Sequence, residues 1–252
     1  MHCYRLFMIY KNLNKSKQNR LIFNVSWVNL FKTILNFIFP ISCAGCSMAD
    51  CVLCNECKSK FSKWHRDPFS GVFCKNIYSC ATYGWAVRRC ILQWKDHGNQ
   101  LLDKPFSNLL FSLIISVVGS SSKVAIIPVP SSFASKRKRG RSHMDPIAKN
   151  VVKSLKKQGV DATFVKAIKM INVRGKSVQA RGSRQRSLRT SKGLSVNVKG
   201  IKSGCKVIII DDIITTGSTL KNCVKELNKS GVAVFACFAL AGVWSKESVL
   251  YS

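Results

Sequence analysis

The chain has 252 residues, of which 46% are hydrophobic, so a packed core is expected and intrinsic disorder is excluded as the default state. Its 41 basic and 11 acidic residues give a net charge of +30, which is extreme for an enzyme that handles only small molecules. Such a surface favours polyanionic partners (nucleic acid, an acidic membrane or a phosphorylated substrate), with a merely basic, soluble surface as an equal alternative.

The N-terminal region predicts neither a signal peptide nor a membrane span. It has no clean apolar segment followed by a small-residue cleavage site, and the run Leu109–Val118 is only about half the length of a span. We therefore expect a cytoplasmic protein. Residues 1–26 are basic and polar and are predicted to be a disordered tail, and residues 27–39 favour an amphipathic helix that Pro40 ends.

Two short cysteine pairs follow, Cys43 with Cys46 and Cys54 with Cys57. Each pair has the spacing of a knuckle that presents two sulfurs to one ion, so four thiolates predict a structural, tetrahedral Zn²⁺ site. Free structural cysteines are the alternative. Cys51 is a possible substitute for Cys54, and the two remaining cysteines of this region are either a decayed second pair or buried thiols: Cys74 and Cys80.

The next elements alternate between helices and strands. Apolar residues at helical spacing predict a helix from Tyr83 to about Lys95 and a second helix over 100–118. The run 124–130 predicts a buried strand that enters a proline-rich loop, and a further helix is expected over 144–157. This alternation is typical of an α/β fold with a parallel sheet.

Basic residues gather between and after these elements. The run Lys136–Arg141 is interpreted in three ways: as a solvated loop, a nucleic-acid patch or a cradle for pyrophosphate. Residues 166–205 are free of acids and suit a mobile basic flap that closes over a polyphosphate or grips a nucleic-acid backbone. The basic residues of the flap are Arg174, Lys176, Arg181, Arg184, Arg186, Arg189 and Lys192.

One stretch organises the chain: a β-branched run, two acids, a hydroxyl- and glycine-rich loop, and a helix. The run Val207–Ile210 predicts a central parallel strand, and the helix is expected from about Leu220 to Lys229. Backbone N–H groups and the helix dipole would meet an anion at the loop, and carboxylates can accept from sugar hydroxyls or hold hydrated Mg²⁺. The polar residues are Asp211, Asp212, Thr215, Thr216, Gly217, Ser218 and Thr219.

This stretch resembles the phosphoribosyl pyrophosphate (PRPP) motif of type I phosphoribosyltransferases. Together with the helix that ends in Phe-Pro, the cysteine knuckles, the Tyr-Gly-x-x-Val-Arg helix and Ile-Pro-Val-Pro, it resembles the ComF family, which is linked to bacterial competence. The resemblance implies a type I phosphoribosyltransferase-like parallel sheet with flanking helices and a hood. The domains expected are a tail (1–26), a helix with a Cys-rich zinc module (27–82) and a phosphoribosyltransferase-like domain (83–252).

The resemblance also implies roles for residues. Asp211 and Asp212 would contact the ribose hydroxyls, residues 215–219 would hold the 5′-phosphate, and the turn after Pro130 would approach pyrophosphate. Gln179 and Arg186 match flap residues of the family, and Arg181 and Arg186 are the catalytic candidates. The chain departs from the family at 139–144, where Arg-Gly-Arg-Ser-His-Met replaces Arg-Gly-Phe-Asn-Gln-Ala, which leaves phosphoribosyl binding expected and turnover open.

Two function classes remain. The first is an enzyme that transfers ribose 5-phosphate from PRPP with Mg²⁺, to an acceptor that the sequence does not identify. Thr215 stands where purine-salvage relatives carry an acid, which disfavours a hypoxanthine or guanine acceptor. The second is a non-catalytic accessory with a relic phosphoribosyl site that binds single-stranded DNA and works with DNA-uptake or recombination proteins. Bases could stack on Trp64, Trp85 and Trp94, although these aromatics also fit a core.

Overall fold

The structure is a computed structural model that describes residues 41–62, 65–67, 76–120, 122–171 and 193–243. The chain divides into two compact units, Met1–Ser42 and Cys43–Ser252. The tail expected at 1–26 and the helix expected at 27–39 lie outside the described residues. The architecture is that of the second unit.

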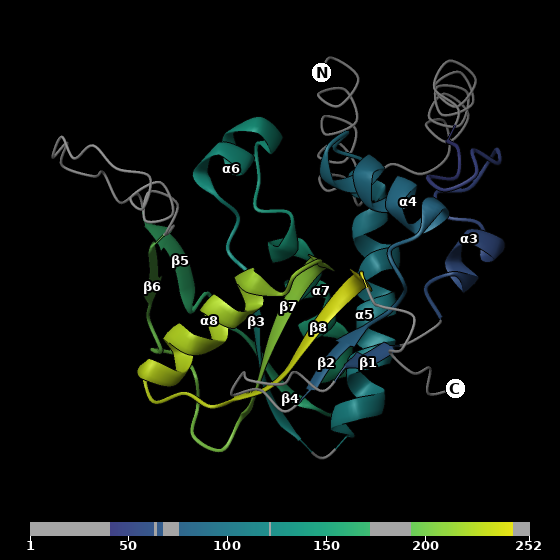
Figure 1. The fold of residues 1–252 in the computed structure, drawn as a ribbon. Helices are drawn as coiled ribbons and strands as arrows, with labels where there is room; N and C mark the ends of the chain where they lie inside the picture. Colours follow the sequence, from purple (N-terminus) through teal and green to yellow (C-terminus); the bar gives the residue numbers. More distant parts are fainter. Residues whose placement is uncertain (1–40, 63–64, 68–75, 121, 172–192, 244–252) are drawn as a thin grey trace, which may run out of the picture. The chain divides into compact units, whose positions relative to one another are not determined.

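The second unit is built on a six-stranded sheet in the order β1-β2-β8-β7-β3-β4 (Figure 1). Every neighbouring pair in this sheet is parallel except β1 with β2. Its strands are β1 (His65–Asp67), β2 (Asn76–Ser79), β3 (Lys123–Pro128), β4 (Asp161–Phe164), β7 (Lys206–Ile214) and β8 (Val234–Gly242). The predicted α/β fold with a parallel sheet is confirmed.

Strand β7 lies between β3 and β8 and is buried on both faces. Ile208 and Ile210 join the larger hydrophobic core, whereas Val207 and Ile209 join the smaller core on the opposite face. This alternation follows from the two-residue period of a strand, and a strand covered on both faces needs a continuous apolar run. The strand continues through the two acids to Ile214, beyond the predicted run, because β8 pairs with it along that whole length.

The helices cover the two faces of the sheet. Helix α5 (Asp103–Val118) and helix α7 (Met144–Lys157) contribute their buried side chains to the larger core, and α8 (Ser218–Lys229) contributes to the smaller one. The remaining helices are α3 (Asn55–Ser59), α4 (Trp85–Lys95), the short 3-10 helix η1 (Gln100–Leu102) and α6 (Phe133–Arg139). The helices predicted from Tyr83, over 100–118 and over 144–157 are therefore confirmed.

A second, two-stranded antiparallel sheet pairs β5 (Ile168–Ile171) with β6 (Gly193–Val196). These strands flank residues 172–192, so all seven basic residues named above in the predicted flap lie outside the described residues. The large sheet, for its part, takes β1 and β2 from the region before residue 83 and the other strands from the region after it.

One helical stretch in the described part of the chain qualifies the expectation of no membrane span. Gln100–Val118 has 19 residues and a mean hydropathy of 1.5, which meets the length and composition of a span. The helix of a soluble core passes the same test, and Phe106, Leu110 and Leu113 are here almost fully buried in the larger core. The stretch is thus explained by packing against the sheet.

Candidate functional site

The loop after β7 carries the predicted phosphate-binding residues. It joins the end of β7 at Ile214 to the start of α8 at Ser218. Gly217 is buried and has φ of 67°, a left-handed conformation that glycine adopts without strain. The Thr216 hydroxyl donates to the Ser218 hydroxyl at 3.2 Å. The hydroxyl side chains of residues 215, 216, 218 and 219 are exposed at the N-terminus of a twelve-residue helix, which is a favourable place for an anion.

Asp212 is buried at the end of β7, with 5% of its surface exposed. Its Oδ1 accepts the backbone N–H of Ile213 at 2.7 Å. Its Oδ2 accepts from Nε2 of His143 at 2.8 Å and forms an ion pair with Nζ of Lys95. Burial alone would raise the pKa of Asp212, but the hydrogen bond from His143 and the charge of Lys95 outweigh it and hold that pKa well below the usual range.

His143 connects Asp212 to the loop after β3. It is 6% exposed, and its ring lies edge-on to that of Trp94 with centroids 5.0 Å apart. Its Nδ1 lies 3.3 Å from the Ser131 hydroxyl and 3.4 Å from a guanidinium nitrogen of Arg139. Because a guanidinium can only donate, this arrangement places a lone pair on Nδ1 and the proton on Nε2, which faces Asp212.

Asp211 differs from its neighbour. It is partly exposed, and its Oδ1 accepts the backbone N–H of Asp212 at 2.8 Å. Burial, and then the negative charge of Asp212, raise the pKa of Asp211 well above its usual range. Asp211 is therefore a carboxylate that gains from an incoming cation or hydroxyl donor.

The basic run predicted at Lys136–Arg141 is neither wholly a loop nor wholly solvated. Most of it forms helix α6, where Lys136, Arg137 and Lys138 are exposed. Arg139 pairs with Asp96 at 3.3 Å. The first three cations of the run are thus exposed, whereas Arg139 is held by Asp96. This arrangement is compatible with a nucleic-acid patch and with a cradle for pyrophosphate.

Asp103 fixes the last residue of that run. Arg141 makes two bonds to its carboxylate, at 2.6 and 2.9 Å, and Trp94 Nε1 donates to it at 2.6 Å. A two-bond contact between a guanidinium and a carboxylate sets the orientation of both groups. Helices α4 and α5 therefore hold the turn between α6 and α7 in place.

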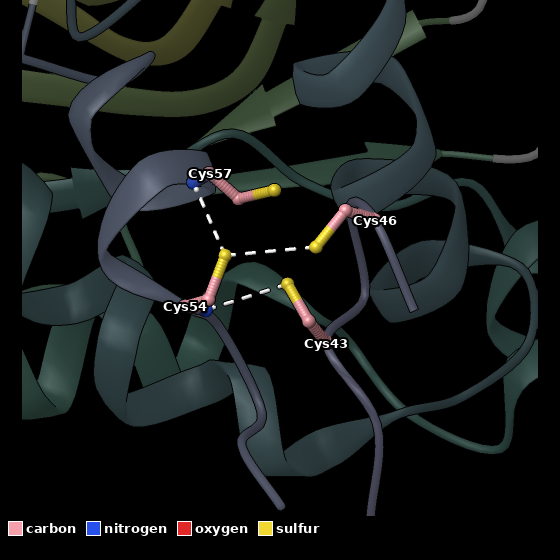
Figure 2. Close-up of side chains that lie close together, drawn as sticks. All are labelled: Cys43, Cys46, Cys54 and Cys57. Atoms are coloured by element: carbon pink, nitrogen blue, oxygen red, sulfur yellow. Dashed lines mark hydrogen bonds between the residues drawn. The ribbon is translucent and has the colours of Figure 1, made fainter. Parts of the chain in front are cut away.

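The four predicted zinc ligands converge on one point (Figure 2). The Sγ atoms of Cys43, Cys46, Cys54 and Cys57 all lie within 4.8 Å of one another, and those of Cys46 and Cys54 are 3.6 Å apart. Tetrahedral Zn²⁺ with Zn–S bonds of about 2.3 Å requires sulfurs about 3.8 Å apart, so the cluster fits zinc. A closed site of four sulfurs would leave no open position on the ion for chemistry, so a zinc ion bound there would have a structural role.

Backbone groups support thiolates in this cluster. The N–H of Cys54 donates to Cys43 Sγ at 3.3 Å, and the N–H of Cys57 donates to Cys54 Sγ at 3.4 Å, where Cys54 caps helix α3. Burial would raise the pKa of Cys43, but backbone hydrogen bonds from Cys54, Cys46 and Gly45 lower it to about 6. Such bonds favour the deprotonated form of Cys43 that binds a metal, whereas burial and hydrogen bonds with the other thiols raise the pKa of Cys57 well above its usual range.

The structure also decides several side predictions. Cys51 is not part of the four-sulfur cluster, and Cys80 is a fully buried thiol whose pKa is raised by burial. Trp94 is 1% exposed in the core, so its predicted role in base stacking is wrong, whereas Trp85 is 77% exposed. The remaining predicted site residues, Cys74, Trp64, Gln179, Arg181 and Arg186, lie outside the described residues.

Sequence reasoning missed the partners of Asp212 and Arg141. No motif in the sequence marks Lys95, Ser131 or Asp103 as a site residue. The scarcity of acids is a signal that points to Asp103, because in a chain with 11 acidic and 41 basic residues few of the acids are expected to lack a basic partner. Nothing in the sequence pairs residue 95 or 143 with residue 212.

Comparison with known proteins finds similarity in the part of the chain that contains the loop after β7. Residues 145–250 match the family described as the phosphoribosyl transferase domain. An adenine phosphoribosyltransferase from Rhodopirellula baltica is 39% identical over 44 residues, which are 18% of this chain and 21% of that protein. The chain thus spans about a fifth of the length of this curated relative. The matched segment supports the type I phosphoribosyltransferase superfamily.

Two solved structures show distant likeness. The structure of the allosteric regulatory enzyme of purine biosynthesis aligns with a TM-score of 0.34 and 17% identity, covering 54% of this chain and 25% of that one. The phosphoribosylpyrophosphate synthetase from Mycobacterium smegmatis aligns with a TM-score of 0.32 and 20% identity, covering 56% of this chain and 35% of that one.

Proposed function

We propose that this protein binds PRPP with Mg²⁺ and acts as a phosphoribosyltransferase-like protein of the ComF type. The observation that carries this proposal is the end of β7, where a pair of carboxylates precedes an exposed hydroxyl loop at the N-terminus of α8. The match of this segment to the phosphoribosyl transferase domain supports it. Residues 215–219 hold the 5′-phosphate, and the pair formed by Asp211 and Asp212 lies on the ribose side.

The chemistry is a displacement at the anomeric carbon of the ribose. The bond from this carbon to the pyrophosphate oxygen breaks, a nucleophile forms a new bond to the carbon, and pyrophosphate leaves. Negative charge grows on the leaving group, so cations near the loop after β3 and in the flap stabilise it; Arg181 and Arg186 are the flap candidates. The protein otherwise supplies orientation.

Mg²⁺ fits the ribose side of the site. Asp211 is a partly exposed carboxylate whose ionised form is disfavoured by burial and by Asp212, and hydrated Mg²⁺ binds through such oxygens. When bound, Mg²⁺ neutralises charge on the pyrophosphate. The acceptor nucleophile is not specified by any residue described above.

Calorimetric titration tests the proposal directly. Titration of PRPP with Mg²⁺ into zinc-loaded protein should give saturable binding, and Asp211→Asn should weaken it by about ten- to a hundredfold, the size of a lost charge-assisted hydrogen bond. Asp161→Asn is the matched control, because it removes the same charge at the start of β4, away from the loop, and should leave binding unchanged. Absence of binding to folded wild-type protein would overturn the proposal.

A second candidate function, binding of single-stranded DNA in competence or recombination, has an observation of its own. Trp85 on α4 is 77% exposed, with the guanidinium of Arg89 5.3 Å from its ring centroid. Phe133 on α6 is 48% exposed, with the ammonium group of Lys136 5.9 Å from its ring. Helices α4 and α6 both lie on the side of the sheet where β7 and β8 end (Figure 1).

Exposed rings beside cations are the usual platform for stacked bases. Fluorescence anisotropy with a labelled oligo-dT should show binding that weakens steeply with salt. Trp85→Ala should weaken it by roughly tenfold, as expected for one lost stacking contact. Lys202→Ala, at an exposed position beyond β6, is the control for a lost surface charge. Binding that is insensitive to Trp85→Ala and to salt would exclude this second function.

A further inference from the structure

The two carboxylates at the end of β7 differ in how many of their acceptor positions are already filled. Asp212 receives a backbone N–H on Oδ1 and both Lys95 and His143 on Oδ2. It is 5% exposed, so little of it can meet a ligand. A carboxylate whose oxygens already accept from two side chains and the backbone holds those protein groups in place and has little capacity left for a ligand.

Asp211 has the opposite character. Within the described residues, its one hydrogen bond is to the N–H of Asp212, through Oδ1. It is partly exposed and makes no ion pair within the described residues, and burial and the charge of Asp212 raise its pKa. Asp211 is therefore the carboxylate of the pair that can accept a hydrogen bond from a hydroxyl group outside the chain.

The bonds of Asp212 lead to the segment expected to face pyrophosphate. From Asp212 the path runs to His143, and from His143 Nδ1 to the Ser131 hydroxyl in the loop after β3 and to Arg139 at the end of α6. Ser131 is 8% exposed, so this path is shielded from water. The Nε of Arg139 is buried with no hydrogen-bond partner within the described part of the chain.

We propose that Asp212 and His143 are positioning residues that hold the β3–α6 loop for the pyrophosphate end of the ligand, while Asp211 alone of the pair contacts the ribose. This inference rests on the proposed function and assigns separate roles within its site. Lys95 acts with them, because it compensates the charge of Asp212 from the end of α4. His143 accepts at Nδ1 and donates at Nε2, a pattern that glutamine can reproduce through its amide oxygen and nitrogen.

Hydrogen exchange of the protein without ligand tests the positioning role by itself. Asp212→Asn and His143→Ala should speed amide exchange in residues 131–143 by about tenfold or more, because they release the loop. Asp211→Asn is the matched control and should leave exchange there unchanged. His143→Gln should restore slow exchange, which general loss of stability would not allow. Equal exchange in all four variants would overturn the positioning role, whether or not the protein binds PRPP.

Ligand titrations then test the division of roles. His143→Ala should weaken PRPP and inorganic pyrophosphate by about tenfold and change ribose 5-phosphate little, since the loop faces only the pyrophosphate end. Asp211→Asn should weaken PRPP and ribose 5-phosphate alike, and His143→Gln should recover affinity for pyrophosphate. If wild-type protein binds none of these ligands, the proposed function and the ribose role of Asp211 fail together, while the exchange experiment still decides the positioning role. If His143→Ala weakens all ligands equally, the division of roles is wrong.

Discussion

At the scale of single residues, two adjacent and chemically identical side chains have opposite environments. Asp212 is buried against Lys95 and His143, and these partners lower its pKa. Asp211 is only partly exposed, makes no ion pair within the described residues and lies next to a like charge, and burial and that charge raise its pKa. Asp212 therefore stabilises the fold as an anion, whereas ionised Asp211 destabilises it until a ligand compensates the charge.

This difference predicts opposite effects of one substitution. At neutral pH Asp212→Asn should lower the free energy of unfolding by about 3 kcal/mol, because it leaves the partly buried Lys95 ammonium group without its partner. Asp211→Asn should raise it by about 1 kcal/mol, because it removes a desolvated charge beside another. Urea unfolding of the two variants and wild type measures both effects, and a loss of similar size in both would contradict the assignment.

The pH dependence of stability follows with definite signs. The folded pKa of Asp212 is below its ordinary value of 3.8, so its contribution is present above that value and is lost as pH falls through the lowered pKa. The folded pKa of Asp211 is above 3.8, so the contribution of its protonated form is lost as pH rises through the raised pKa. The free energy of unfolding of Asp211→Asn should therefore lack the decline that wild type shows as pH rises through the raised pKa of Asp211. A pH profile identical to that of wild type would refute this sign.

At the scale of elements, the close approach of Gly45 to two cysteine side chains decides which residues the first cysteine knuckle tolerates. An added Cβ at Gly45 would lie 2.5 Å from Cys57 Sγ and 3.1 Å from Cys90 Sγ. Cys90 is fully buried on α4, and Arg89 of the same helix donates to the Ser47 hydroxyl at 3.1 Å. The first knuckle is therefore seated directly on α4, the helix that also carries Lys95.

Substitution at this contact should disturb the metal site. In Gly45→Ala the added methyl must displace Cys57 Sγ, so we expect zinc affinity to fall by at least about tenfold, as for other changes that misplace ligands. Competition with a coloured chelator measures this change. Gly98→Ala is a control, because the added Cβ there has no atom within 4 Å; Gly98, unlike Gly45, has a positive φ, of 72°, so this control also shows whether backbone strain away from the knuckles affects zinc. Equal zinc affinity in both variants would show that the knuckle adapts.

At the scale of the whole molecule, the cysteine-rich segment and the sheet share one core. Phe61, which follows α3, is fully buried and lies 5.6 Å from the ring of Phe106 on α5. Ala44, between the first two cysteines, belongs to the same hydrophobic core, and β2 extends the sheet beside β8. Removal of a metal from the cysteine cluster is therefore expected to destabilise the sheet as well as the knuckles.

Chelation of zinc should consequently lower the melting temperature of the described unit as a whole. We expect a single calorimetric transition at a lower temperature after removal of zinc. Metal binding contributes to the free energy of folding, and the knuckles and the sheet share one core. Two separate transitions, with the upper one unchanged, would show that the knuckles fold independently of the sheet. Protein carrying Cys46→Ser and Cys54→Ser, in which both knuckles lose a ligand, should behave like the chelated wild type.

The local order of the chain determined most of its elements. The β-branched run of β7, the helical spacing of Val87, Cys90 and Ile91, and the paired cysteines specify their structures through contacts close in sequence, so the sequence alone predicts them. The same holds for the loop at 215–219, whose glycine and hydroxyls predict an anion site before any tertiary contact is considered.

Only the tertiary structure decided which groups face one another. Lys95, His143 and Asp212 come from three elements, and their meeting depends on how α4 and the start of α7 pack at the end of β7. Burial of Trp94 and exposure of Trp85 likewise depend on which side of α4 meets the core. A sequence fixes periodicity and residue chemistry, whereas the pairing of distant charges and the sign of their pKa shifts arise from burial and distance, which exist only in the folded chain.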